Sequence, residues 1–155
     1  MRFLIVILLF IGASNVLIGQ KLKVLRFDQL EQLIEKPTDS LLIFNFFATW
    51  CKPCMQEIPD FLKLQKEVSN KPIQFYFISL DMEKDSNKIF ANFIEKYQTR
   101  DFTYLLKVPK GDWISKIDQN WQGNIPATLV INHKKKLRKF IAKPMDYQSL
   151  TKLIK

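Results

Sequence analysis

Two nearly continuous apolar runs, separated by a segment of helical periodicity, constrain the fold of this chain more than any other feature. The runs are residues 41–48 (LLIFNFFA) and 73–80 (IQFYFISL). Their length and their aromatic and β-branched content are typical of strands that are covered on both faces. A buried strand, a helix and a second buried strand favour parallel pairing through a crossover connection. The sequence therefore predicts an α/β fold built around central strands.

The remaining elements extend this unit on both sides without a domain boundary. At 155 residues, the chain has the size of one ordinary domain and can bury a core of its own. Asp28 is the expected N-cap of the first helix. Expected strands cover residues 23–27, 102–106, 127–132 and 137–141; expected helices cover residues 28–35, 54–68, 86–97, a segment through Trp113, Ile117 and Trp121, and 146–154.

The amino terminus predicts export. A positive start at Met1 and Arg2 precedes a nine-residue apolar run over residues 3–11 and a small-residue region at 12–14. The run is shorter than the ~20 residues that a spanning helix needs, so an uncleaved anchor is the secondary interpretation. We therefore expect a signal peptide over residues 1–19, a domain over residues 20–155, and a periplasmic or other extracytoplasmic location where disulfides persist.

The formal net charge of +9 does not predict a nucleic-acid partner. Basic residues are spread along the chain, and the densest run, residues 133–139 (HKKKLRK), is typical of a solvated hairpin turn leading into a strand. The charge is compatible with an acidic protein partner or an anionic membrane face.

Both cysteines of the chain, Cys51 and Cys54, lie within four residues at the end of the first buried run. A structural zinc site needs four ligands, and His133, placed among lysines in the expected turn, is the chain's one histidine and is expected at the surface. A disulfide that closes so short a loop adds little stability. Thiolates suit monovalent copper, so a copper(I) carrier stays open. A redox-active pair fits these residues better.

The expected junction between strand and helix supplies the chemistry for a redox pair. The helix N-terminus and the neighbouring Lys52 favour a thiolate at Cys51, and Pro53 falls near the first helical position, where its missing N–H costs nothing. We expect Cys51 to be the exposed, acidic nucleophile and Cys54, one turn inside the helix, to be the buried resolving thiol.

The motif WCKPC after an aromatic strand, with NIPATLVIN far downstream, resembles the thioredoxin superfamily. The longer stretch FFATWCKPCMQEIP is similar to the secreted TlpA/ResA-type thiol-disulfide oxidoreductases, and the resemblance extends from residue 22 to the end. It implies a thioredoxin-like fold: a central mixed sheet flanked by helices, with an extra strand–helix insertion before a cis-proline. It implies no cofactor.

The resemblance also assigns residues to a site. Pro126 matches the family's cis-proline, which leaves the backbone of Ile125 free to pair with an extended substrate; the alternative is a proline that simply starts a strand. Trp50 would offer a flat apolar contact. Glu57 matches a glutamate that takes part in the active site of the ResA-like branch, the alternative being a solvated helix residue. Asn45 stands where thioredoxin has a buried aspartate.

The function that follows is dithiol–disulfide exchange. Reduced Cys51 attacks a substrate disulfide, and Cys54 then releases the reduced substrate while Glu57 or water accepts its proton. The resemblance implies disulfide-containing exported proteins as substrates, apocytochrome c among them. It implies resupply of electrons by a membrane thiol-transfer protein of the DsbD/CcdA type. We expect the protein to act as a monomer.

Three further functions compete with disulfide reduction. Net disulfide oxidation would follow if the Cys51 thiolate were strongly stabilised. A peroxidase is disfavoured because Phe44, Phe47 and Ala48 occupy the upstream positions where its Pro-x-x-x-Thr/Ser-x-x-Cys setting would lie. A binding module with a disulfide that never cycles is the third. One departure from the family pattern concerns the last hairpin turn, where residues 132–136 (NHKKK) replace the usual Asp and Gly.

Overall fold

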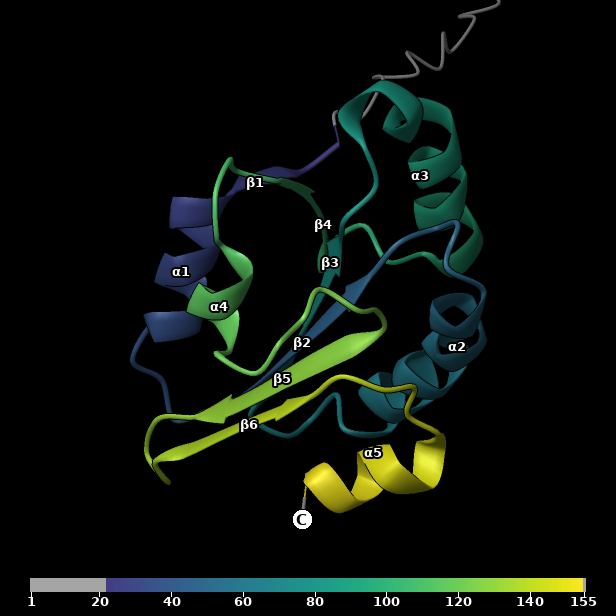
Figure 1. Cartoon of the computed structure of the whole chain (residues 1–155). Coiled ribbons are helices and arrows are strands. Elements are labelled where there is room, and N and C mark those ends of the chain that lie inside the picture. Colours follow the sequence, from purple (N-terminus) through teal and green to yellow (C-terminus); the bar gives the residue numbers. More distant parts are fainter. Residues whose placement is uncertain (1–21, 155) are drawn as a thin grey trace, which may run out of the picture.

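A six-stranded mixed sheet with helices on both faces forms the protein (Figure 1). The computed structural model describes residues 22–154, apart from the side chains of residues 83–87. The strand order is β1-β4-β3-β2-β5-β6. The strands are β1 (Val24–Arg26), β2 (Leu41–Phe47), β3 (Ile73–Ser79), β4 (Thr103–Lys107), β5 (Ala127–Asn132) and β6 (Leu137–Ile141); the helices are α1 (Phe27–Glu35), α2 (Lys52–Glu67), α3 (Glu83–Tyr97), α4 (Ile114–Ile117) and α5 (Tyr147–Leu153).

Strand β2 lies at the centre of the sheet, and all seven of its residues are buried. It pairs in parallel with β3, where Phe47 is opposite Ser79, and antiparallel with β5, where Phe46 is opposite Ala127. The predicted α/β class, the parallel pairing of the two apolar runs and the mixed sheet are confirmed. Because β2 is buried on both faces and paired on both sides, the core fixes the position of the residues that directly follow it.

Two hydrophobic clusters fill the two faces of the sheet. One packs α2, α3 and α5 against the sheet, with Phe61, Phe77 and Phe90 fully buried. The other packs α1 and α4 against the opposite face around Phe44 and Phe46. Figure 1 shows the same division of helices between the faces. Burial of these aromatic side chains contributes to stability, because each removes a large apolar area from water.

Strand β4 is the extra strand of the predicted insertion. It lies between β1 and β3 and pairs in parallel with both, so that Leu105 is opposite Val24 on one side and Ser79 on the other. The carboxyl ends of β2, β3 and β4 therefore meet at one edge of the sheet. We call this the carboxyl edge.

Two local predictions were wrong. Helix α1 begins at Phe27 after an N-cap at Arg26, so Asp28 is not the cap; its carboxylate instead accepts hydrogen bonds from the Arg26 guanidinium at 3.0 and 2.7 Å. Helix α4 ends before Asp118, which is extended, and does not reach Trp121. The Trp121 indole is buried and donates its N–H to the Asn124 carbonyl at 2.8 Å, a contact that a continued helix would prevent.

The predicted signal peptide, residues 1–19, lies outside the described residues, and so does the alternative of an uncleaved anchor. Within residues 22–154, no helix is both long and apolar enough to cross a membrane.

The hairpin turn between β5 and β6 replaces the usual Asp and Gly with other residues in the same roles. Asn132 Oδ1 accepts a hydrogen bond from the Lys135 backbone N–H at 2.8 Å. Lys136 has a φ of 52°, a left-handed conformation that favours glycine. The turn geometry is therefore kept, with strain at Lys136.

Substituting Lys136→Gly should stabilise the protein. Glycine adopts this φ without a steric cost, and the gain, reduced by the greater freedom of glycine in the unfolded chain, should be about 0.5–1 kcal/mol. The measurement is the free energy of unfolding in urea. The matched control is Lys135→Gly in the same turn, which should not stabilise because Lys135 is not at positive φ; equal gains in both variants would refute the argument.

Candidate functional site

The two cysteines lie where β2 passes into α2. Cys51 is the N-cap residue of α2, Cys54 lies in its first turn, and Pro53 takes an early helical position between them. A disulfide joins the cysteines, with an S–S distance of 2.08 Å and a Cα–Cα distance of 5.2 Å. The junction has the form that the sequence predicts, and it brings both sulfurs to the carboxyl edge of the sheet.

The helix N-terminus acts directly on the Cys51 sulfur. The backbone N–H of Cys54 donates to Cys51 Sγ at 3.3 Å, and the partial positive charge of the α2 terminus lies on the same side. Both effects favour a thiolate at Cys51 after reduction. In this disulfide form Cys51 is 6% exposed and Cys54 is 0% exposed. The prediction of an exposed Cys51 was wrong in degree, because its sulfur belongs to the core cluster under α2.

The segment before β5 faces Cys51. The Ile125–Pro126 peptide bond is cis, and the Ile125 carbonyl oxygen lies 3.8 Å from Cys51 Sγ. The antiparallel register, with Phe46 opposite Ala127, brings Pro126 to the end of β2, where the cysteines begin. The alternative of a proline that only starts a strand does not account for this placement beside the sulfur.

Trp50 is the most exposed large hydrophobic side chain among the described residues, at 72%. It immediately precedes Cys51 and lies outside both core clusters. An exposed aromatic side chain beside a sulfur offers apolar area that a binding partner can cover.

Glu57 is buried, so the alternative of a solvated glutamate was wrong. Its side chain is 3% exposed, and its two oxygens accept hydrogen bonds from Asn45 Nδ2 at 2.7 Å and from the Met145 backbone N–H at 2.8 Å. Burial raises the pKa of Glu57 to about 7, against the opposing effect of the two hydrogen bonds, and the nearby Asp60 adds to the rise. A carboxyl group with this pKa can take or give a proton near neutral pH.

Asn45 lies on β2 next to Glu57 and is 1% exposed. Its Nδ2 donates to Glu57 and also contacts Thr128 Oγ1 at 3.4 Å, whereas its Oδ1 has no hydrogen-bond partner among the described residues. Rotation of the amide by half a turn would offer this oxygen as an acceptor to a protonated Glu57. The Asn45–Glu57 pair can therefore accommodate both protonation states of the carboxyl group.

Asp81, which no sequence motif singled out, orders the loop in front of the cysteines. Its buried carboxylate accepts from the Thr49 backbone N–H at 3.1 Å, from Thr49 Oγ1 at 2.6 Å and from Ser79 Oγ at 2.6 Å. One sequence signal could have identified Asp81. It is an acidic residue just past the end of a buried parallel strand, and that strand neighbours the one that leads to the cysteine motif. Asp81 fixes the position of the Thr49–Trp50 segment relative to β3.

His133 lies in the hairpin turn, as predicted, but it is not a free surface residue. It is half-buried, and its Nε2 lies 2.8 Å from the Ile34 carbonyl oxygen near the end of α1. Among the residues that the structure describes, no three His, Cys, Asp or Glu side chains gather as they would around a metal ion.

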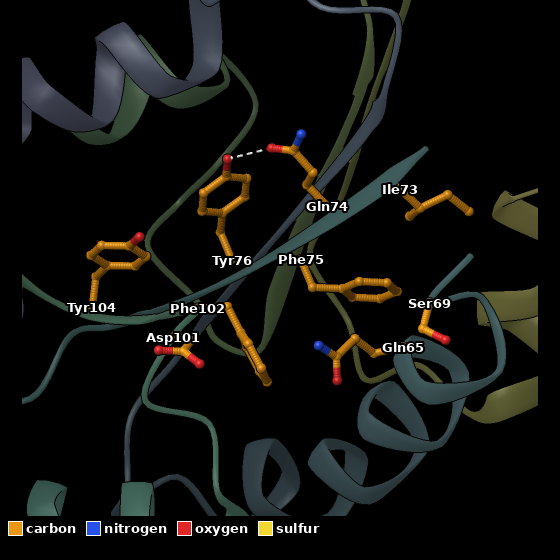
Figure 2. Close-up of a pocket in the computed structure, with 9 residues that line it drawn as sticks. All are labelled: Gln65, Ser69, Ile73, Gln74, Phe75, Tyr76, Asp101, Phe102 and Tyr104. Atoms are coloured by element: carbon orange, nitrogen blue, oxygen red, sulfur yellow. Dashed lines mark hydrogen bonds between the residues drawn. The ribbon is translucent and has the colours of Figure 1, made fainter. Parts of the chain in front are cut away.

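A different hollow, of about 380 Å³, lies at the start of β3, at the edge of the sheet opposite the cysteines. Figure 2 shows that Tyr76 and Tyr104 project to one side of the strand and Phe75 and Phe102 to the other. Its one hydrogen bond between lining side chains joins Tyr76 Oη to Gln74 at 2.8 Å. The lining groups do not converge on one point, so the carboxyl edge is the better candidate site.

Comparison with known proteins points the same way. The model of the AhpC/TSA family matches residues 25–140. The thioredoxin-like protein YneN of Bacillus subtilis is 37% identical over 71 residues, which are 44% of this chain and 38% of YneN. The thiol-disulfide oxidoreductase ResA of Bacillus cereus is 29% identical over 91 residues, which are 59% of this chain and 48% of ResA. The chain thus spans less than half the length of each of these two relatives.

A solved structure shows the fold. The thiol:disulfide interchange protein of the thioredoxin family from Chlorobium tepidum superposes with a TM-score of 0.61 at 24% sequence identity, covering 75% of this chain and 78% of that chain. The predicted thioredoxin-like fold is confirmed.

Proposed function

Because the chain belongs to the AhpC/TSA family, we propose that it is a thiol-disulfide oxidoreductase that reduces disulfides of exported proteins. The observation that carries the proposal is the position of Cys51 as the N-cap of α2, 3.8 Å from the Ile125 carbonyl beside a cis-proline. This arrangement combines a stabilised thiolate with a free stretch of backbone where an extended substrate segment can pair.

The first step joins protein and substrate. The Cys51 thiolate attacks one sulfur of the substrate disulfide, a new S–S bond forms between Cys51 and that sulfur, and the second substrate sulfur leaves as a thiolate that takes up a proton. The Cys54 N–H and the α2 terminus stabilise the attacking thiolate. Trp50 and the backbone of Ile125 hold the substrate segment on either side of the sulfur.

The second step releases the substrate. Cys54 loses its proton, its thiolate attacks Cys51 Sγ, and the mixed disulfide breaks so that the substrate leaves as a dithiol. Two electrons and two protons pass from the Cys51–Cys54 pair to the substrate, and the pair becomes the disulfide. Glu57, one helical turn after Cys54 and with its pKa raised to about 7, accepts the Cys54 proton directly or through water.

The setting of this reaction is part of the proposal. Residues 1–19 act as an export signal, residues 20–155 form the thioredoxin-like domain, and the protein works as a monomer outside the cytoplasm. No cofactor takes part. A membrane thiol-transfer protein of the DsbD/CcdA type returns electrons to the Cys51–Cys54 pair, and apocytochrome c is one candidate among the disulfide-containing substrates.

The reduction potential of the Cys51–Cys54 pair tests the proposal. We expect one two-electron couple near about −270 mV or lower, the range of reducing thioredoxins. The measurement is equilibration of protein lacking residues 1–19 in thiol buffers, followed by alkylation of free thiols, with the Cys51→Ser/Cys54→Ser variant as the control that shows no titration. A value near about −120 mV would make the protein an oxidase instead. Failure to titrate as a two-electron couple would reject a redox function and return copper(I) carriage as the alternative.

A further inference from the structure

The carboxyl edge carries a row of apolar residues, and only one of them, Trp50, has a role in the proposed reaction. Phe47, Ser79 and Leu105 lie side by side in β2, β3 and β4. Three residues further along each segment come Trp50, Met82 and Val108. We call these three residues the apolar edge row.

The exposure of this row is unusual for the molecule. Six large hydrophobic side chains are exposed among the residues whose burial the structure describes, and three of them form the row: Trp50 at 72%, Met82 at 60% and Val108 at 48%. Single exposed hydrophobic residues need no explanation, but three at the sheet edge that also carries the cysteines indicate a binding surface.

A cavity lies beneath the outer part of the row. It has a volume of about 260 Å³ and is lined by Leu80, Asp81, Met82, Leu106, Lys107 and Val108. The end of β4 and the segments that follow β3 and β4 therefore flank one hollow, whose lining includes four apolar side chains. Lys107 is exposed, and the carboxylate of Asp81 is already occupied by its own hydrogen bonds, so an uncharged or acidic segment fits better than a basic one.

Asp81 ties the row to the redox site. Its hydrogen bonds from Thr49 fix the segment that carries Trp50 and Cys51, and Asp81 itself directly precedes Met82. The backbone N–H of Leu80 also donates to the Phe47 carbonyl at 2.8 Å, which continues the pairing of β2 and β3 toward the site. The hollow thus keeps a fixed position relative to the attacking sulfur, as a preorganised binding surface requires.

From these contacts we propose that the hollow between Met82 and Val108 binds an apolar side chain of the substrate polypeptide, close in sequence to the attacked cysteine. The inference rests on the proposed function and names the substrate class of the same site. Neighbouring strands lie ~4.8 Å apart, so Val108 lies about 10 Å along the edge from the segment that holds Cys51. An extended peptide covers ~3.3 Å per residue, which places the apolar side chain about three residues from the cysteine.

Strand β4 thereby gains a role. Because β4 lies between β1 and β3, the hollow is built partly from the insertion, with Leu106, Lys107 and Val108 as its outer wall. The cysteines supply the chemistry, and the insertion contributes to the choice of substrate.

Two synthetic peptides test the inference. Each is a dimer joined by one disulfide, and they differ only in having leucine or serine three residues to either side of the cysteine. The measured quantity is the second-order rate constant for their reduction by the reduced protein. We expect the wild-type protein to prefer the leucine peptide by roughly 10-fold, the scale of one apolar contact. Met82→Ser/Val108→Ser should lower that preference to about twofold or less.

A matched control is available in exposed hydrophobic residues elsewhere. Val24 is 47% exposed and Ile89 is 55% exposed, close to the values for Val108 and Met82. Val24→Ser/Ile89→Ser should retain the wild-type preference, and Met82→Gln/Val108→Thr provides a second test pair whose folding is checked by its unfolding midpoint.

The outcomes distinguish failure of this inference from failure of the proposed function. No leucine preference in the wild-type protein, or an equal preference in the Met82/Val108 variants, overturns the inference while leaving disulfide reduction intact. Reduction of the small disulfide reagent DTNB by the wild-type protein tests the proposed function separately, because this reagent is too short to span the row. If neither DTNB nor either peptide is reduced, the proposed function fails and the inference fails with it.

Discussion

Cys54→Ser should convert the protein from a reductant that turns over into one that stays covalently bound to its substrate. The variant keeps Cys51 with its helix terminus and its neighbouring Ile125 carbonyl, so the first attack still occurs. The mixed disulfide then lacks the internal thiol that resolves it. An external thiol at millimolar concentration cannot match an intramolecular one, so turnover should fall by ~10³-fold or more.

The trapped species can be counted directly. Reduced Cys54→Ser protein is mixed with a disulfide peptide, and the yield of covalent adduct is measured by mass spectrometry with and without reductant. Serine is close to cysteine in size and fits the fully buried position, while Cys51→Ser/Cys54→Ser should form no adduct. If Cys54→Ser forms no reducible adduct, Cys51 is not the nucleophile.

The wild-type protein should lose stability as the pH rises, and the Glu57→Gln variant should lack this loss. The pKa of Glu57 is raised to about 7 in the folded state, from an ordinary value of 4.5. Between these values the folded protein holds a proton that the unfolded chain has released. The stabilising contribution is therefore complete below pH 4.5 and is lost as the pH rises through about 7, a total of about 3 kcal/mol.

Glutamine fits the same position without a buried clash. Its oxygen can accept from the Met145 N–H, and its amide can donate to Asn45 Oδ1, which has no partner among the described residues, once the Asn45 amide turns over. Because other groups also titrate, the measured quantity is the difference in unfolding free energy between Glu57→Gln and wild type in urea at pH 4.5, 6 and 8. That difference should shift by up to about 3 kcal/mol in favour of Glu57→Gln.

An exposed glutamate provides the control for this titration. Glu95 lies on the solvent side of α3, and Glu95→Gln should keep the pH dependence of the wild-type protein. A constant difference between Glu57→Gln and wild type across the three pH values would show that the buried carboxyl group does not hold its proton near neutral pH.

The central strands and the cysteine junction could be predicted because their signals are local. Strand β2 begins at Leu41 as predicted and ends one residue earlier than predicted, at Phe47, and β5 has the predicted bounds Ala127–Asn132. A continuous apolar run leaves a strand few alternatives. The placement of Cys51 at the N-cap follows equally from a proline at the start of the helix.

The features that the sequence did not predict depend on contacts between distant segments. The burial of Glu57 requires Met145, which is 88 residues away in the chain, and the Thr49–Asp81 hydrogen bonds join two loops that no periodicity connects. The expected helix through Trp121 showed acceptable helical spacing, but a hydrogen bond to Asn124 and burial against Phe46 hold the indole in a loop instead. Tertiary packing overrode a weak local preference there.

The direct pairing of β2 with β5 separates the position of the redox site from the length and composition of the chain segment between the two strands. Cys51 and Ile125 are 74 residues apart in sequence, yet neighbouring strands hold them together, and the whole of α3, β4 and α4 leaves and returns between them. That excursion can lengthen, shorten or change its side chains without altering the spacing between sulfur and carbonyl. Under the proposed function, changes in that excursion would alter the contacts to substrate while the pairing of β2 with β5 keeps the Cys51 sulfur beside the Ile125 carbonyl.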